Sequence, residues 1–140
     1  MLNDQLKRKI EKFFSEKKYE ELIALTDKYI QYNERSPGLA CLIATCIILK
    51  KQKTDSDTVS ALNYFEEGIT KGGSSDIGLS GVVNYINISL KAARRKTIFL
   101  PFIKKAEKFY FQTETYFKKN PQFLSAGKNL FWFQLDNKNL

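Results

Sequence analysis

The spacing of apolar residues constrains this chain more than any other feature of its sequence. In the first segment Leu6, Ile10, Phe13 and Phe14 recur at helical intervals, with charged residues between them. Such spacing places one apolar stripe on an α-helix. The same period returns along the whole chain, and no stretch shows the sustained alternation of a half-buried strand. Because 140 residues with 43% hydrophobic side chains can bury one core, the sequence predicts a single all-α domain spanning 1–140.

Start and stop signals divide the chain into about seven helices. Ser36 and Pro37 suit a helix start, as the N-cap and the first helical residue. The charged stretch 51–57 has no periodicity and is predicted to be a loop. Paired glycines at 72–73 and the Asn120-Pro121 step are predicted to end helices. The expected helices cover about 6–14, 19–30, 37–50, 58–71, 77–96, 98–119 and 122–136.

Three of these segments show a degenerate internal repeat. The second helix contains Tyr19-Glu-Glu-Leu22-Ile23, the fourth contains Ala61-Leu62-Asn-Tyr-Phe65, and the sixth contains Ala106-Glu-Lys-Phe109-Tyr110. Aligning Leu22, Ala61 and Phe109 brings apolar or small residues together at most of the repeated positions. In the helices that precede the second and fourth, Ile10 and Ala44 lie 34 residues apart. A period of this length is typical of paired-helix repeats.

On these residues the chain resembles the tetratricopeptide repeat (TPR) family. The match includes the turn before Tyr19, Ala61 and Phe65, and Pro121, whereas Lys17 stands where the family's turn usually has glycine. The resemblance implies antiparallel helix pairs stacked as a short, TPR-like right-handed superhelix. It implies units at about 3–36, 37–74 and 75–121, with a capping helix at about 122–136. It also places Ala61 where the third and fourth helices approach each other most closely.

The residue types needed for common catalytic sites are missing or badly placed. Histidine is absent, which excludes mechanisms that need an imidazole base or ligand. Cys41 and Cys46 lie five residues apart on one expected helix, so their thiols diverge, and we interpret both as small core residues. No phosphate-binding glycine loop or nucleophile elbow occurs in the sequence. We therefore expect no enzyme activity, no cofactor and no metal.

The adjacent acidic pairs do not suggest acid–base chemistry either. Glu20-Glu21 and Glu66-Glu67 are neighbours on expected helices, so the two carboxylates of each pair point in different directions. Both pairs occupy expected surface positions next to the apolar stripe of their helix. We interpret all four carboxylates as solvated surface groups.

Positive charge is concentrated in the C-terminal half. Residues 75–140 hold eleven basic and four acidic side chains, which accounts for nearly all of the net charge of +8. Three interpretations remain open: solvated helix faces, a groove for an acidic protein segment, and phosphate contacts with nucleic acid. The candidate basic patch consists of Lys91, Arg94, Arg95, Lys96, Lys104, Lys105 and Lys108.

The last helix is rich in aromatic residues. Phe131, Trp132 and Phe133 point in different directions on one turn, so at least one is expected to stay exposed. Trp132 is the candidate exposed contact, either for a partner or for a second copy in a homo-oligomer.

These features predict a non-catalytic protein–protein interaction or scaffold module of helical-repeat type, whose partner is another protein or an acidic peptide. The alternative is a basic nucleic-acid-binding helical protein. The longest apolar run, Leu39 to Leu49, is too short to span a bilayer. Because the N-terminus does not resemble a signal peptide, we expect a cytoplasmic location.

Overall fold

The structure is a computed structural model that describes residues 3–137, and it confirms the all-α prediction. Within this range no strand occurs, and the chain forms seven α-helices and two short 3-10 helices. They are α1 (Asp4–Ser15), α2 (Tyr19–Tyr29), η1 (Tyr32–Glu34), α3 (Pro37–Leu49), α4 (Asp55–Gly72), α5 (Asp76–Arg95), η2 (Thr97–Phe99), α6 (Leu100–Phe117) and α7 (Pro121–Asp136).

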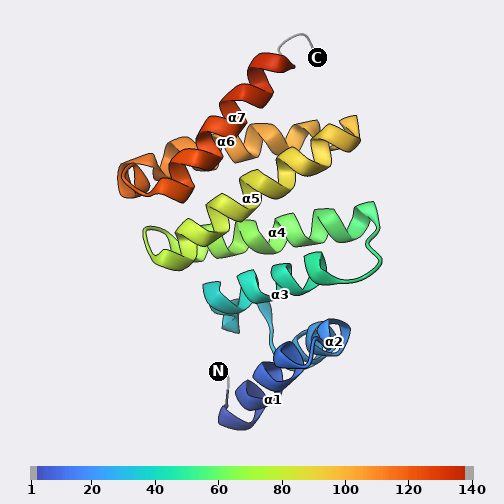
Figure 1. The fold of residues 1–140 in the computed structure, drawn as a ribbon. Coiled ribbons are helices and arrows are strands. Elements are labelled where there is room, and N and C mark those ends of the chain that lie inside the picture. The colour runs from blue at the N-terminus through green and yellow to red at the C-terminus, as the bar shows by residue number, and fades with distance from the viewer. Residues whose placement is uncertain (1–2, 138–140) are drawn as a thin grey trace.

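The helices are stacked along one direction, with α1 at one end of the molecule and α7 at the other (Figure 1). Successive helices pack against each other, and α3 also contacts α5, as α5 contacts α7. Helices α3, α5 and α7 therefore form one row, while α4 and α6 lie on the other side of it (Figure 1). This arrangement of neighbours is typical of stacked helix pairs.

Side-chain caps fix where most helices begin. The first backbone N–H groups of a helix have no carbonyl partner within the helix. At five helix starts, a side chain accepts a hydrogen bond from one of these N–H groups. These caps precede α1, α3, α4, α5 and α7, and the residues are Asn3, Ser36, Thr54, Ser75 and Asn120.

The predicted boundary that differs most from the structure is the start of the fourth helix. The expected loop 51–57 is shorter, because α4 already begins at Asp55. Thr54 and Asp57 form a capping box: the Thr54 hydroxyl accepts from the Asp57 N–H (3.1 Å), and the Asp57 carboxylate accepts from the Thr54 N–H (2.9 Å). Their polar side chains resemble loop residues in the sequence, although they form the first turn of the helix.

The turn between α1 and α2 contains a lysine in a glycine-like conformation. Lys17 has a φ of 60°, in the left-handed region that favours glycine. The Lys18 N–H donates to the Phe13 carbonyl at 2.8 Å, which closes the end of α1. In the resemblance to the tetratricopeptide repeat family, Lys17 occupies the position of the turn glycine.

The core consists of two adjoining clusters of buried side chains. The larger one joins α3 to α7 and contains Phe65, Tyr85 and Phe123. The smaller one joins α1 to α4 around Leu22 and Ile43. Burying each large side chain contributes about 1.5–3 kcal/mol, and the two clusters together extend from α1 to α7.

We predict that Ala61→Leu destabilises the fold by about 1–3 kcal/mol, because a larger side chain overpacks a closed contact. Ala61 is fully buried with Leu39, Ile43 and Ile47 of α3. Thermal unfolding followed by circular dichroism should show the melting temperature fall by several degrees. Asn63→Leu, at an exposed position of the same helix, is the control and should change it little. A neutral or stabilising Ala61→Leu would show that Ala61 is not at a tight helix contact.

Candidate functional site

A groove of about 530 Å³ runs between α5 and α7, in the row formed by α3, α5 and α7. We call it the polar groove. Its lining combines a few apolar side chains with hydroxyl and carboxamide groups from both helices. It is lined from α5 by Asp76, Leu79, Ser80, Val83, Asn84 and Asn87, and from α7 by Pro121, Gln122, Ser125, Ala126 and Asn129.

The walls of the polar groove can both donate and accept hydrogen bonds. Each carboxamide carries two donors and an acceptor oxygen. The Asn84 amide donates to the Ser80 hydroxyl at 3.2 Å. Within residues 3–137, the side chains of Asn87, Gln122 and Asn129 make no hydrogen bond to another residue. These three amides are therefore available to a bound molecule.

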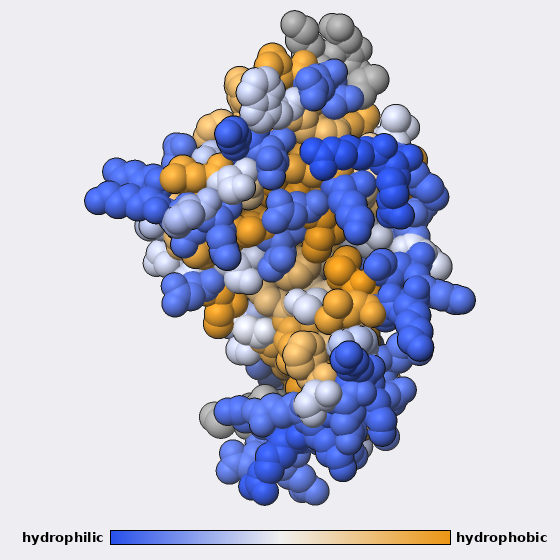
Figure 2. All heavy atoms as spheres, viewed as in Figure 1, coloured by the Kyte–Doolittle hydropathy of each residue, from blue (hydrophilic) through white to orange (hydrophobic). Residues whose placement is uncertain are grey.

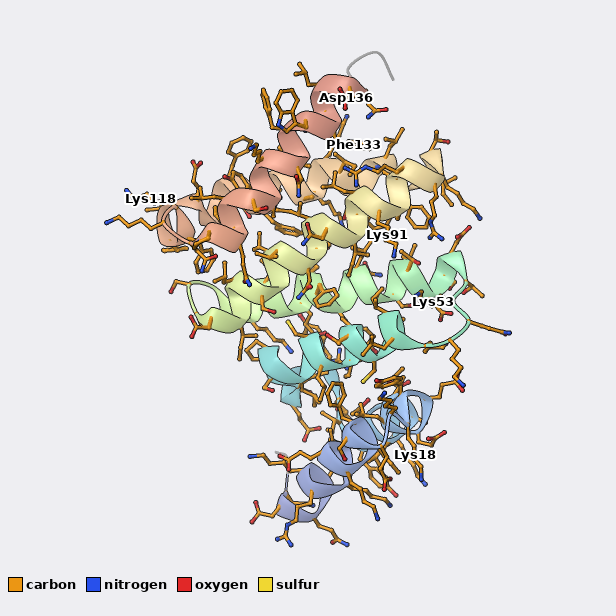
Figure 3. The ribbon with its side chains drawn as sticks, viewed as in Figure 1. Lys18, Lys53, Lys91, Lys118, Phe133 and Asp136 are labelled. Carbon is orange, nitrogen blue, oxygen red and sulfur yellow. The ribbon has the colours of Figure 1, made fainter. Side chains whose placement is uncertain are left out.

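The polar groove has an acidic residue at one end, and two cations of α5 lie beyond its other end, which we call the basic end. Asp76 lies at the start of α5. Further along, helical spacing places Lys91 and Arg94 on the same side of α5 as Asn87. The Arg94 guanidinium lies 5.9 Å from the centre of the Phe133 ring on α7, and Figure 3 labels Lys91 and Phe133 on their helices. A ligand along α5 would thus meet opposite charges at its two ends.

All seven residues of the candidate basic patch are exposed, but the structure divides them among different surroundings. Lys96 forms an ion pair with Asp55 at 2.7 Å, and Lys105 forms one with Glu66 at 3.2 Å. Among the described residues, the other five have no ion-pair partner: Lys91, Arg94, Arg95, Lys104 and Lys108.

The outer side of α6 carries two cations followed by an aromatic ring. Lys104, Lys108 and Phe111 follow one another at helical spacing, and all three are exposed. Lys118 extends away from the body of the molecule at the end of the same helix (Figure 3).

Trp132 is half-exposed, and Phe131 beside it is more exposed, whereas Phe133 is buried against the core. Rings of the aromatic turn thus lie in solvent, and the role of Trp132 as a contact residue stays a prediction.

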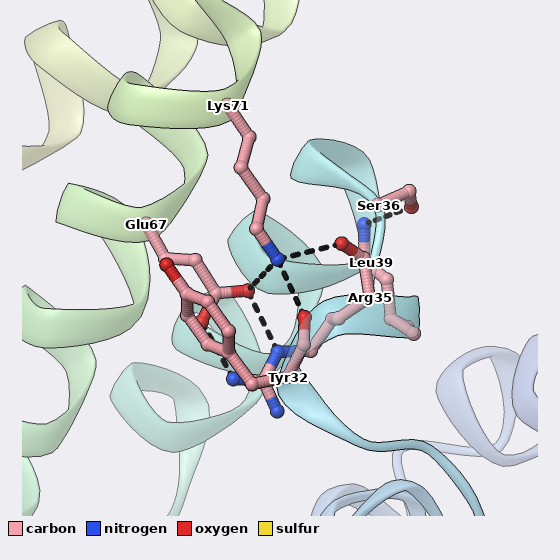
Figure 4. Close-up of polar contacts among 6 residues, drawn as sticks. All are labelled: Tyr32, Arg35, Ser36, Leu39, Glu67 and Lys71. Atoms are coloured by element: carbon pink, nitrogen blue, oxygen red, sulfur yellow. Dashed lines mark hydrogen bonds and ion pairs between the residues drawn. The ribbon is translucent and has the colours of Figure 1, made fainter.

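A partly buried charge cluster that the sequence analysis missed joins the segment before α3 to α4 (Figure 4). Arg35 donates two hydrogen bonds to the Glu67 carboxylate, from Nε at 2.7 Å and from an Nη at 2.5 Å. Lys71 donates to the same carboxylate at 3.1 Å and to the carbonyls of Tyr32 and Arg35 at 2.7 and 2.8 Å. The rings of Tyr32 and Tyr64 lie 5.5 and 4.9 Å from the guanidinium carbon. We call this cluster the Arg35–Glu67 junction.

The interpretation of Glu66-Glu67 as solvated groups was therefore wrong for Glu67, which is only 8% exposed. Its neighbour Glu66 lies at the surface and pairs with Lys105. The only signal in the sequence was the four-residue spacing of Glu67 and Lys71. Arg35 lies 32 residues away from Glu67 in a non-helical segment, so no local pattern connects the two.

Burial alone would raise the pKa of Glu67, but the hydrogen bonds from Arg35 and Lys71 outweigh it and hold the pKa below its ordinary value. The Glu67 carboxylate in turn raises the pKa of Arg35. Both shifts favour the charged forms of Glu67 and Arg35, so the ion pair is intact at neutral pH. The junction is a structural element.

The two cysteines are equally unsuited to nucleophilic chemistry. Both are free. Burial raises the pKa of each thiol to about 11, and the Glu67 charge adds to the effect at Cys41. A thiol that stays protonated at neutral pH is a poor nucleophile.

Two further searches cover residues 3–137. No group of three or more Cys, Asp or Glu side chains is placed to hold a metal ion there. Nor does that part of the chain contain a helix with the length and hydropathy needed to cross a bilayer.

Comparison with protein-family models, with curated proteins and with solved structures found no match. The relation to tetratricopeptide repeats stays a prediction from the sequence.

We predict that the Arg35–Glu67 junction makes the fold sensitive to acid. Because folding lowers the pKa of Glu67, its carboxylate stabilises the folded state above about pH 4.5, and this contribution is lost as pH falls further. Glu67→Gln should cost about 3 kcal/mol at pH 7, since it leaves buried cations unpaired. Melting temperatures measured from pH 7 to pH 3 should then decline less steeply for the variant than for the wild type.

The neighbouring Glu66→Gln removes a carboxylate with an exposed ion pair, and it is the matched control. It should change stability little and keep the wild-type acid profile. Equal effects of the two substitutions would show that the junction does not stabilise the fold.

Proposed function

We propose that this chain is a non-catalytic interaction module that binds an extended segment of another protein in the polar groove. The observation that carries the proposal is the facing of hydroxyl and carboxamide side chains across a groove between two helices. Helical-repeat arrays commonly use the surface of one helix row for binding.

An extended polypeptide suits this chemistry because it offers N–H and C=O groups along its length. Carboxamides can pair with both kinds of group. From Ser80 to Asn87 the helix rises about 10 Å, the length of about three extended residues. Side chains at both positions could therefore contact one short stretch of main chain.

The charge at the basic end favours a segment with acidic residues there. Neither Lys91 nor Arg94 has an ion-pair partner among the described residues, so a carboxylate of the ligand would not displace an existing pair. Such charges fix the orientation of a ligand and speed its association.

Selection from a phage-displayed library of random decapeptides tests the proposal without knowledge of the natural partner. We expect the chain to enrich peptides with acidic residues near one end. The variant Asn84→Ala/Asn129→Ala should weaken their binding at least about tenfold in fluorescence anisotropy, because it removes hydrogen bonds from both walls.

The control variant Asn33→Ala/Asn63→Ala removes two exposed carboxamides outside the polar groove and should leave the affinity unchanged. Failure to enrich any peptide, or equal loss in both variants, would contradict a binding site in the polar groove.

A second candidate function is binding of single-stranded nucleic acid. It is favoured by the five cations of the basic patch that have no ion-pair partner among residues 3–137, and by the exposed Phe111, which follows Lys108 on α6. Aromatic rings among cations can stack on bases while the cations contact phosphates.

We predict that nucleic-acid binding through this patch would weaken steeply with salt. Five phosphate contacts give a slope of about −3.5 in a plot of log K against log salt for a single strand. Anisotropy with a labelled 20-nucleotide RNA measures this slope. Lys104→Glu/Lys108→Glu should abolish binding, whereas Lys7→Glu/Lys9→Glu on α1 is the charge-matched control. No binding at low salt would exclude this function.

A further inference from the structure

The last helix leaves an apolar face in solvent. Leu124, Phe131, Trp132 and Leu135 are between 44% and 58% exposed, and they lie on the side of α7 opposite its buried residues. With Lys128 and Asp136 they form what we call the α7 outer face. Figure 2 shows apolar residues gathered at the α7 end of the molecule, whereas the α1 end is almost wholly polar on the face drawn.

The α7 outer face is self-complementary. Lys128, Trp132 and Asp136 follow one another at four-residue steps, so one cation and one anion lie about 6 Å along the axis on either side of the tryptophan. Among the described residues, neither charge has an ion-pair partner. If two such helices pair antiparallel about Trp132, Lys128 of each copy lies opposite Asp136 of the other.

We propose that the α7 outer face binds the same face of a second copy, which forms a two-fold dimer centred on Trp132. An isologous interface requires one patch that is complementary to itself, and this face meets that requirement in both charge and hydropathy. On the face drawn in Figure 2, the α1 end presents mainly polar residues.

The size of the apolar patch is that of an interface core. The four exposed side chains present on the order of 400 Å². A standard interface buries about 800 Å² on each partner, of which somewhat more than half is apolar. The polar groove adjoins this face, because helical spacing places its residues Ser125 and Asn129 on the same stripe of α7 as Trp132 and Asp136. The dimer and peptide binding are therefore tested by separate measurements.

Sedimentation equilibrium and light scattering over a range of concentrations test the dimer directly. We expect a mass twice the 16.2 kDa of the chain at high concentration. Trp132 is the only tryptophan of the sequence. Its fluorescence should therefore shift to shorter wavelength as the dimer forms and the indole leaves water.

Charge exchange tests the antiparallel register. Lys128→Glu places two pairs of like charges across the interface, as does Asp136→Lys, so each variant should weaken the dimer at least tenfold. The double variant Lys128→Glu/Asp136→Lys should restore it, and an equimolar mixture of the two single variants should form heterodimers. Lys108→Glu on α6, with the same change in charge, should leave the dimer intact.

Circular dichroism and melting temperature verify that every variant is folded. A chain that stays monomeric at all concentrations with unshifted fluorescence would overturn the proposal. A dimer that responds to none of the charge exchanges would overturn pairing about Trp132. Peptide binding measured on the monomeric variant shows separately whether the polar groove functions.

Discussion

The bidentate ion pair of Arg35 with Glu67 holds together the two parts of the stack that are least firmly connected. Helix α1 packs mainly against α2, and α2 reaches the rest of the molecule through α3. The short segment between α2 and α3 is fixed to α4 by the Arg35–Glu67 junction, in which Lys71 also binds two backbone carbonyls. Because a largely buried charge left without its partner costs about 3 kcal/mol, displacing this segment from α4 is unfavourable. The direction in which α3 starts, and with it the rest of the stack, follows from the position of this segment.

From α3 onward the fold is held by packing. Helix α5 contacts α3, α4, α6 and α7, so it is the centre of the stack. Close approaches between helices depend on small residues: a Cβ at Gly127 would overlap the ring of Tyr110, and one at Gly68 would overlap the Cys41 sulfur. The close approach of Gly127 to Tyr110 and the hydrogen bond from Gln134 to Glu107 set α7 against α6, whereas the contact of Gly68 with Cys41 sets α4 against α3. The polar groove exists because α7, held in this way, faces α5 with serine and carboxamide side chains in place of apolar ones.

The sequence was sufficient to predict the helices because their signals are local. Apolar periodicity, helix starts and helix stops each depend on a few neighbouring residues. The structure has helix boundaries at the three predicted signals, which are Ser36-Pro37, the paired glycines and Asn120-Pro121. The start of α4 was predicted incorrectly because the residue types of Thr54 and Asp57 fit both a loop and a capping box. The Arg35–Glu67 junction could not be predicted, since it joins residues 32 positions apart. The polar groove was missed for a related reason: its amides are unremarkable surface residues on either helix alone, and only the packing of α7 beside α5 makes them face each other.

The central claim is that the carboxamides of the polar groove bind the main chain of a partner. Nuclear magnetic resonance of the ¹⁵N-labelled chain, titrated with a peptide selected for binding, tests it most directly because each side-chain amide gives its own signals. The account predicts that the side-chain signals of Asn84, Asn87, Gln122 and Asn129 shift on binding while those of Asn33 and Asn63 stay in place. Shifts confined to the lysines of α6 or to the Trp132 indole, with the groove amides unmoved, would contradict it.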